Sequence, residues 1–164
     1  MYTSRQIKDL AAISVAEYAA SRNGPTIRGR NGQEHLRGTS LEEVAKNNRM
    51  TIDEADALTV DLFAATFENL SPYWQTIHLD CAEEMIKFME QMGGESVILA
   101  LNLRDDDICA HFGARLHQFW LEQPANILAH VASLHKPFPE LTPDIQNRYI
   151  CKLKALQQWL IAMP

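Results

Sequence analysis

Apolar residues recur at the three-to-four-residue period of amphipathic helices along most of the chain. In residues 4–21, Ile7 and Leu10 share one apolar face, and Gly24-Pro25 follows the last apolar position. The same spacing predicts further helices at 41–48, 52–70, 72–92, 105–122, 124–135 and 143–162. We therefore expect an all-α fold in which seven to eight helices form a single domain over residues 1–164.

Polar residues mark where these helices begin and end. Ser40 with Glu43 has the capping-box spacing, and Thr51 with Glu54 repeats it. Further start and stop signals are Ser71-Pro72, Gly93-Gly94, Asp105-Asp106-Asp107 and Thr142-Pro143. The predicted helices therefore have definite boundaries at most of their ends.

Two short segments carry weaker patterns. Residues 95–103 are continuously apolar in the middle, which fits a buried helix or a strand. We favour the helix because the neighbouring segments are helical and no partner strand is evident. Residues 136–139 contain two prolines and predict an extended connector.

Residues 22–38 interrupt the helical pattern with a glycine-rich stretch that contains Asn31-Gly32, a strong hairpin signal. A type I′ turn there pairs Arg28 with His35 and Ile27 with Leu36. In this register one face of the hairpin carries Thr26, Arg28, Arg30, Gln33, His35 and Arg37, and the other carries Ile27, Gly29, Glu34 and Leu36. The alternative is a solvated loop that uses its arginines for solubility.

Composition is that of an ordinary globular protein, with 46% hydrophobic and 22% charged residues, but the charge is uneven. Residues 1–50 contain eight Lys or Arg and five Asp or Glu, whereas residues 51–164 contain seven and sixteen. A basic arm on an acidic protein indicates an anionic partner, such as a nucleic acid or an acidic protein surface. The candidate anion-binding or nucleic-acid-binding residues are Arg22, Arg28, Arg30, His35 and Arg37.

The stretch 41–58 resembles an imperfect helix-turn-helix motif. Ala45 falls where that motif has a small residue, and Met50-Thr51 where it has an apolar residue followed by Ser or Thr. Arg49 occupies the position at which glycine is usual. The resemblance makes the second helix the recognition helix, yet that helix starts with acidic residues from Asp53, which would face phosphates. The alternative is a helical hairpin packed in the core.

No catalytic, metal or cofactor motif emerges from the sequence. The six histidines include no HExxH and no paired ExxH, and no P-loop, GxGxxG or GxSxG occurs. Cys109 lies on an apolar stripe, where a thiol is usually inert packing. We therefore expect no catalytic residues, no metal and no cofactor, and treat an enzyme with an unrecognised site as a third reading.

Some apolar residues fall off the main stripes of their helices, namely Leu79, Ile86, Leu121 and Ile161. A second apolar side indicates burial against another chain. We expect a homodimer, or contact with another protein partner, through the helices at 72–92 or 105–122.

The compartment follows from the cysteines and the hydropathy. Three cysteines at wide spacings, with no CxxC, are atypical of a secreted protein, and the first residues lack the order of a signal peptide. No apolar run approaches the length of a membrane span. We expect a cytoplasmic protein with no membrane contact.

The leading interpretation is a bacterial-type, non-enzymatic binding or regulatory protein that acts through protein–protein contacts. The runner-up is a nucleic-acid-binding regulator that uses the basic arm 22–38 together with the segment 41–58.

Overall fold

The computed structural model describes residues 1–21, 27–32, 34–35, 40–59, 66–124 and 132–164. The fold is all-α, as the periodicity predicts, with one short hairpin. The α-helices are α1 Ser4–Ser21, α2 Leu41–Asn47, α3 Ile52–Leu58, α4 Pro72–Met92, α5 Glu95–Leu99, α6 Asp106–Glu122 and α8 Pro143–Ala162. The strands are β1 Ile27–Arg28 and β2 Glu34–His35, and the short 3-10 helices are η1 Phe67–Asn69, η2 Ala132–His135 and η3 Phe138–Glu140.

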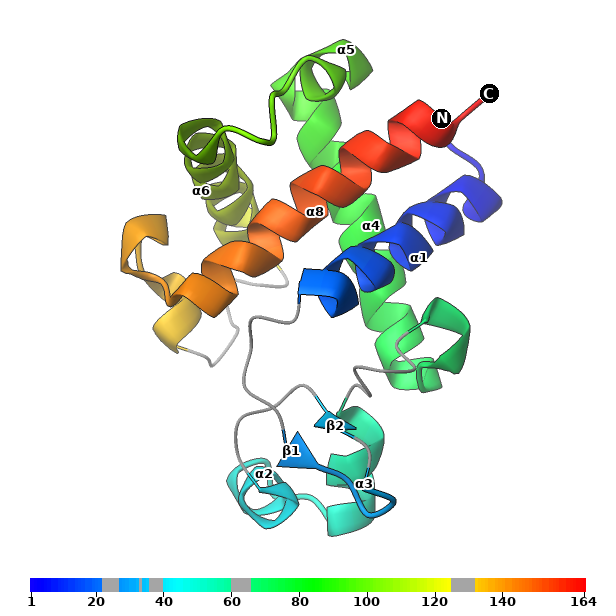
Figure 1. The fold of residues 1–164 in the computed structure, drawn as a ribbon, viewed down its shortest axis with the longest axis vertical. Coiled ribbons are helices and arrows are strands. Elements are labelled where there is room, and N and C mark those ends of the chain that lie inside the picture. Colours follow the sequence, from blue (N-terminus) through cyan, green and yellow to red (C-terminus); the bar gives the residue numbers. More distant parts are fainter. Residues whose placement is uncertain (22–26, 33, 36–39, 60–65, 125–131) are drawn as a thin grey trace.

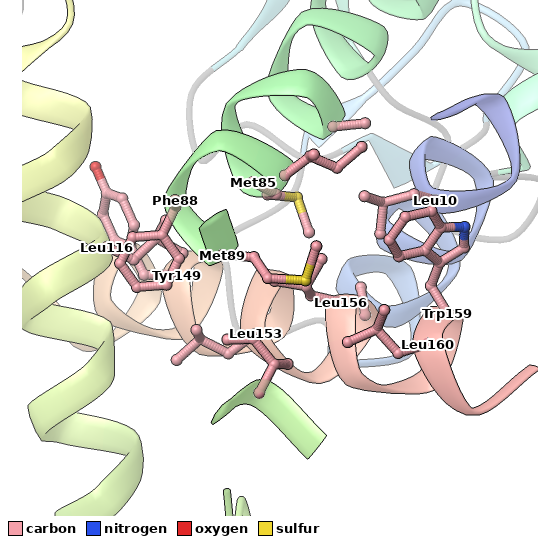
Figure 2. Close-up of a cluster of buried hydrophobic side chains, with 14 of the residues drawn as sticks. Leu10, Met85, Phe88, Met89, Leu116, Tyr149, Leu153, Leu156, Trp159 and Leu160 are labelled. Carbon is pink, nitrogen blue, oxygen red and sulfur yellow. The ribbon is translucent and has the colours of Figure 1, made fainter. Parts of the chain in front are cut away.

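The larger part of the molecule, which we call the body, is built from α1, α4, α5, α6 and α8 with the 3-10 helices. Figure 1 shows α1 and α8 side by side across α4, with α6 on the other side of α8. Their apolar faces meet in one cluster around Met85, Leu153 and Trp159, shown in Figure 2. Burying a large apolar side chain contributes about 1.5–3 kcal/mol, so this cluster is the main source of the body's stability.

A second hydrophobic cluster holds together β1, β2, α2 and α3, which we call the small lobe. Its buried members are Ile27, Leu41, Val44, Ala45 and Ala55, with Met50 and Ile52 packed against them. In the part of the chain that the structure describes, no residue belongs to both clusters. Figure 1 shows the small lobe at the end of the body, below α1 and α4. The single domain over 1–164 stays a prediction.

The predicted caps are present in both parts. Ser40 Oγ accepts from the Glu43 amide and Glu43 Oε2 accepts from the Ser40 amide, so both halves of the capping box form. Thr51 and Glu54 do the same at α3. Gly93 ends α4 in the left-handed conformation, with φ of 116°. Helices predicted at 4–21, 41–48, 72–92, 105–122 and 143–162 are confirmed.

The helix predicted over 52–70 is wrong, because α3 ends at Leu58. Both the amide and the hydroxyl of Thr59 donate to the Asp56 carbonyl, at 3.3 and 2.8 Å, which turns the chain out of the helix. The two ends of the predicted helix also belong to different cores, since Ala55 is buried in the small lobe and Phe67 in the body. A continuous apolar stripe in the sequence therefore hid a boundary between two clusters.

Of the two segments with weaker sequence patterns, 95–103 and 136–139, one prediction is confirmed and the other is wrong in part. The helix favoured within 95–103 is confirmed as α5. The extended connector at 136–139 is wrong at its end, because Phe138 starts the 3-10 helix η3 and its side chain is buried. Gln146 holds this turn by donating to the Phe138 and Leu141 carbonyls. Of the helix predicted at 124–135, residues 125–131 lie outside the described part of the chain.

The small lobe as candidate interface

The hairpin pairs one residue out of the predicted register. Ile27 is opposite His35 and Arg28 is opposite Glu34, whereas the type I′ turn required Arg28 opposite His35. A type I′ turn needs positive φ at both central residues, and Asn31 lacks it. The Gly32 amide instead donates to the Gly29 carbonyl, and Gly32 alone of the turn is left-handed, with φ of 79°. The turn is therefore closed by the hydrogen bond between Gly32 and Gly29, with the left-handed residue at its end.

The one-residue shift changes which side chains face solvent, because side chains alternate along a strand. Ile27 and His35 now share the buried side, where His35 is 6% exposed. Arg28 is exposed. The predicted face that carries Arg28 and His35 together is therefore wrong, because His35 is buried in the lobe while Arg28 is exposed.

His35 packs against α3 through a close approach that glycine permits. Its Nε2 lies 3.6 Å from Oδ1 of Asp56, and neither atom has a hydrogen-bond partner among the described residues. A Cβ at Gly29 would lie 2.7 Å from Oδ1 of Asp56 and closer still to the imidazole. In the sequence, only a glycine next to the hairpin turn hints at this close approach. The predicted register hid it, because it placed Gly29 and His35 on opposite faces of the hairpin.

The remaining candidate anion-binding residues differ in their surroundings. Arg30, in the turn, forms an ion pair with Asp53 at the start of α3, and both side chains are mostly exposed. Arg28 extends from β1 into solvent. Arg22 and Arg37 lie outside the described residues. The Arg30–Asp53 pair joins the turn of the hairpin to the start of α3.

The turn between α2 and α3 is closed by a left-handed residue. Arg49 is left-handed, with φ of 53°, at the position where the motif usually has glycine. The Met50 amide donates to the Ala45 carbonyl and the Arg49 amide to the Lys46 carbonyl. These two bonds form a Schellman helix end. Ala45 and Met50 belong to the lobe core, in which α2 and α3 pack on one another.

The exposed surface of the small lobe is polar and balanced in charge. Among the described residues of the lobe, four basic and four acidic side chains are exposed, namely Arg28, Arg30, Lys46, Arg49, Glu42, Glu43, Asp53 and Glu54. On α2 and α3 the exposed residues include Glu42, Lys46, Asp53 and Glu54. Cations that neutralise phosphates dominate affinity for nucleic acid, and this surface offers as many acids as bases.

Burial shifts the pKa values of several ionisable side chains in the body. In the described ranges, no three His, Cys, Asp or Glu side chains are placed to share a metal ion. Burial raises the pKa of the Cys109 and Cys151 thiols, which keeps them protonated and unreactive. Burial lowers the pKa of His78 to about 4, aided by the charge of Lys152.

His117 is the most buried histidine of the described chain, at 2% exposure. Its Nε2 donates to the Lys136 carbonyl at 2.9 Å, and its ring lies against Tyr149, with centroids 4.9 Å apart. Burial lowers its pKa, so the imidazole is neutral in the fold. The 3-10 helix η3 covers this side of α6, and its Phe138 lies against the His117 ring.

The off-stripe residues that indicated a dimer are placed differently from one another. Ile86 is buried and Leu79 packs against the body core, so the body itself covers the second apolar side of α4. Ile161 is 70% exposed. The homodimer and its interface on 72–92 or 105–122 stay predictions.

None of the helices in the described ranges combines the length and apolarity needed to cross a bilayer. No protein family, no curated protein and no solved structure matches this chain.

Proposed function

We propose that the chain is a non-enzymatic binding and regulatory protein that acts through protein–protein contacts, with the small lobe as its recognition surface. We further propose that it works in the cytoplasm as a homodimer. The absence of disulfides among Cys81, Cys109 and Cys151 supports a reducing compartment.

The observation that carries the proposal is the position of the small lobe in the chain. The lobe lies between α1 and α4, yet α1 and α4 pack directly on one another and on α8. The described lobe residues add nothing to the body's hydrophobic cluster. The lobe is thus a segment inserted between two packed helices, with a hydrophobic core of its own. Because it takes no part in the core of the body, we attribute to it a role in recognition and not in the stability of the body.

Charge favours a protein partner over a nucleic acid. The whole chain carries a formal charge of −6, and residues 22–59 are balanced. Arg30 is engaged with Asp53, so the turn of the hairpin presents little free positive charge. A mixed polar surface of this kind is typical of the rim of a protein–protein interface.

The test compares two surface variants of the full chain. Proteins retained from an extract of the source cells are quantified for the wild type, for the lobe variant Arg28→Glu with Glu54→Arg, and for the body variant Gln118→Arg. We expect a specific set of proteins that the wild type and Gln118→Arg retain and the lobe variant loses. Equal retention by all three variants would remove the lobe from the proposal.

The second candidate is the nucleic-acid-binding regulator, favoured by the left-handed Arg49 in a Schellman turn between α2 and α3. Titration of a labelled DNA duplex at low salt separates the two candidates. Binding that weakens with salt, and weakens further in Arg28→Ala and Arg49→Ala, supports the nucleic-acid reading. No binding at low salt excludes it.

A further inference from the structure

Arg49 is the exception among the left-handed residues of the described chain. The others, Gly32, Gly93 and Gly94, are glycines, which adopt positive φ without a steric penalty. At the Arg49 φ of 53°, the Cβ of an L-residue crowds the following carbonyl oxygen and costs free energy. The Schellman turn after α2 needs a left-handed backbone at this position but no side chain. Glycine at position 49 would therefore close the same turn with less strain.

The Arg49 side chain does not offset this strain through contacts within the described part of the chain. The side chain is exposed, and it forms no ion pair and lies over no aromatic ring there. Residues held in sparsely populated backbone conformations cluster at binding and active sites. The left-handed backbone therefore points to a role of the Arg49 guanidinium outside the fold.

Lys46 supplies a second cation at the same end of α2. The Arg49 amide donates to the Lys46 carbonyl at 3.3 Å, so the backbones of the two residues meet in this turn. All of residues 46–49 are exposed, and Lys46 likewise forms no ion pair with a described residue. Residues 44–52 contain no Asp or Glu. We call residues 46–49 the cationic turn.

Three of the four exposed acidic side chains in the described lobe are engaged within it. Glu43 and Glu54 each accept a hydrogen bond from the N-cap amide of their own helix. Asp53 forms the ion pair with Arg30. The exposed surface of the lobe is therefore balanced in formal charge, but most of its acids have partners while the cations of the cationic turn have none among the described residues.

We propose that the cationic turn is the point at which the small lobe binds its partner, and that the partner presents an acidic segment of a protein. Arginine binds a carboxylate through two parallel N–H donors, and lysine binds one as a point charge. A segment with several Asp or Glu supplies a carboxylate to each cation, so the two side chains need not converge on one group. The inference rests on the proposed function and adds the chemistry of the partner.

The surroundings of the cationic turn favour an acidic segment over a nucleic acid. Glu42, which is exposed, lies about 6 Å from Lys46 along the axis of α2. A nucleic acid carries phosphates along its whole length, so phosphates beyond the cationic turn would meet Glu42 and Glu43. The carboxylates of a short protein segment can be confined to the cationic turn itself.

The experiment measures binding of a labelled polyglutamate peptide to the full chain by fluorescence anisotropy at low salt. The wild type is expected to bind this peptide and not an uncharged glycine–serine peptide. Arg49→Gly and Lys46→Gln are each expected to raise the Kd at least about threefold. Arg104→Gln is the matched control, because Arg104 is an exposed arginine of the body that also forms no ion pair with a described residue. This control is expected to leave the Kd unchanged.

Arg49→Gly separates a role in binding from a role in the fold. Because glycine relieves the left-handed strain, hydrogen exchange of the lobe amides is expected to slow roughly fivefold in this variant. Binding is thus expected to weaken while the lobe becomes more stable, which a purely structural residue would not produce. Arg49→Lys keeps a positive charge and is expected to lose less affinity than Arg49→Gly.

Three results would overturn the inference. These are no binding of polyglutamate by the wild type, equal binding by Arg49→Gly, or an equal loss of binding in Arg104→Gln. Binding of a labelled DNA duplex through Lys46 and Arg49, without binding of polyglutamate, would also overturn it and assign the cationic turn to a nucleic acid.

The retention assay of the proposed function distinguishes the two failures. If Arg49→Gly retains the proteins that the lobe variant Arg28→Glu with Glu54→Arg loses, the role of the cationic turn is wrong and the recognition role of the lobe stands. If polyglutamate binds through Arg49 but all variants retain the same proteins, the recognition role is wrong and the site for an acidic segment stands.

Discussion

Replacing Gly113 with alanine sets two opposing effects against each other. Gly113 is buried within α6, and its φ is not left-handed, so alanine fits the backbone. In a helix interior alanine is favoured over glycine by about 1 kcal/mol. A Cβ at this position would, however, lie 2.8 Å from Cζ of Phe138 and 3.2 Å from another atom of the same ring.

The cost of that overlap depends on whether Phe138 can move. Its ring is buried beside His117 and Tyr149, with centroid separations of 6.3 and 6.2 Å. Overpacking of a core costs about 1–3 kcal/mol, which exceeds the gain in helix propensity. We therefore expect Gly113→Ala to lower the free energy of unfolding by roughly 1 kcal/mol, from the difference of these two effects.

A double-mutant cycle isolates the contact. Phe138→Leu removes the ring atoms that the new methyl group would meet, so in that background Gly113→Ala is expected to raise the stability by up to about 1 kcal/mol. Urea unfolding at fixed pH measures all four proteins. If Gly113→Ala changes the stability equally in both backgrounds, Phe138 does not pack on Gly113 and the account of this contact is wrong.

Three further predictions concern titration, the small lobe and the thiols. Burial lowers the pKa of His78 from 6.5 to about 4, so between these two pH values His78 takes up a proton in the unfolded chain but not in the fold. The free energy of unfolding should therefore fall by up to about 3 kcal/mol as the pH drops from 6.5 towards 4. Urea unfolding at several pH values should show a smaller fall for His78→Asn. Gly29→Ala should push His35 out of the lobe, so hydrogen exchange should quicken in the small lobe while the body stays protected; equal exchange in both would contradict the two separate cores. Cys81, which is partly exposed, should react with a thiol reagent before the buried Cys109 in the native protein, and simultaneous reaction would show that the core opens as readily as the surface.

The sequence predicts local features of this fold well, because they depend on a few adjacent residues. Capping boxes at Ser40 and Thr51 and the glycine stop at Gly93 need only the identity of neighbours three or four positions away. The helix period likewise reveals which face is apolar. It does not reveal which core that face enters, which is why the helix predicted over 52–70 ran through the boundary at Thr59.

The hairpin shows the same limit within the candidate interface. Asn31-Gly32 correctly predicts a turn. The predicted type I′ turn and the observed turn, in which only Gly32 is left-handed, shift the pairing of the two strands by one residue relative to one another. Only the packing of Ile27 and His35 against the helices selects between them. That selection buries His35, and the turn brings Arg30 to Asp53, a partner from another segment that the hairpin sequence alone does not reveal.

The placement of the small lobe between α1 and α4 has a consequence for synthesis of the chain. All described contacts of the lobe core come from residues 27–55, so that core can close soon after they emerge. The body core cannot, because α1 packs on α8; the Ser21–Asn147 hydrogen bond, for example, joins residues 126 positions apart. Local contacts form quickly and distant ones late, so the part of α1 that packs on α8 stays uncovered until the last helix is made, even after α4 has packed on α1. We expect pulsed hydrogen exchange during refolding to protect the lobe before α1, and the ribosome-bound chain to present a folded lobe ahead of an unfinished body.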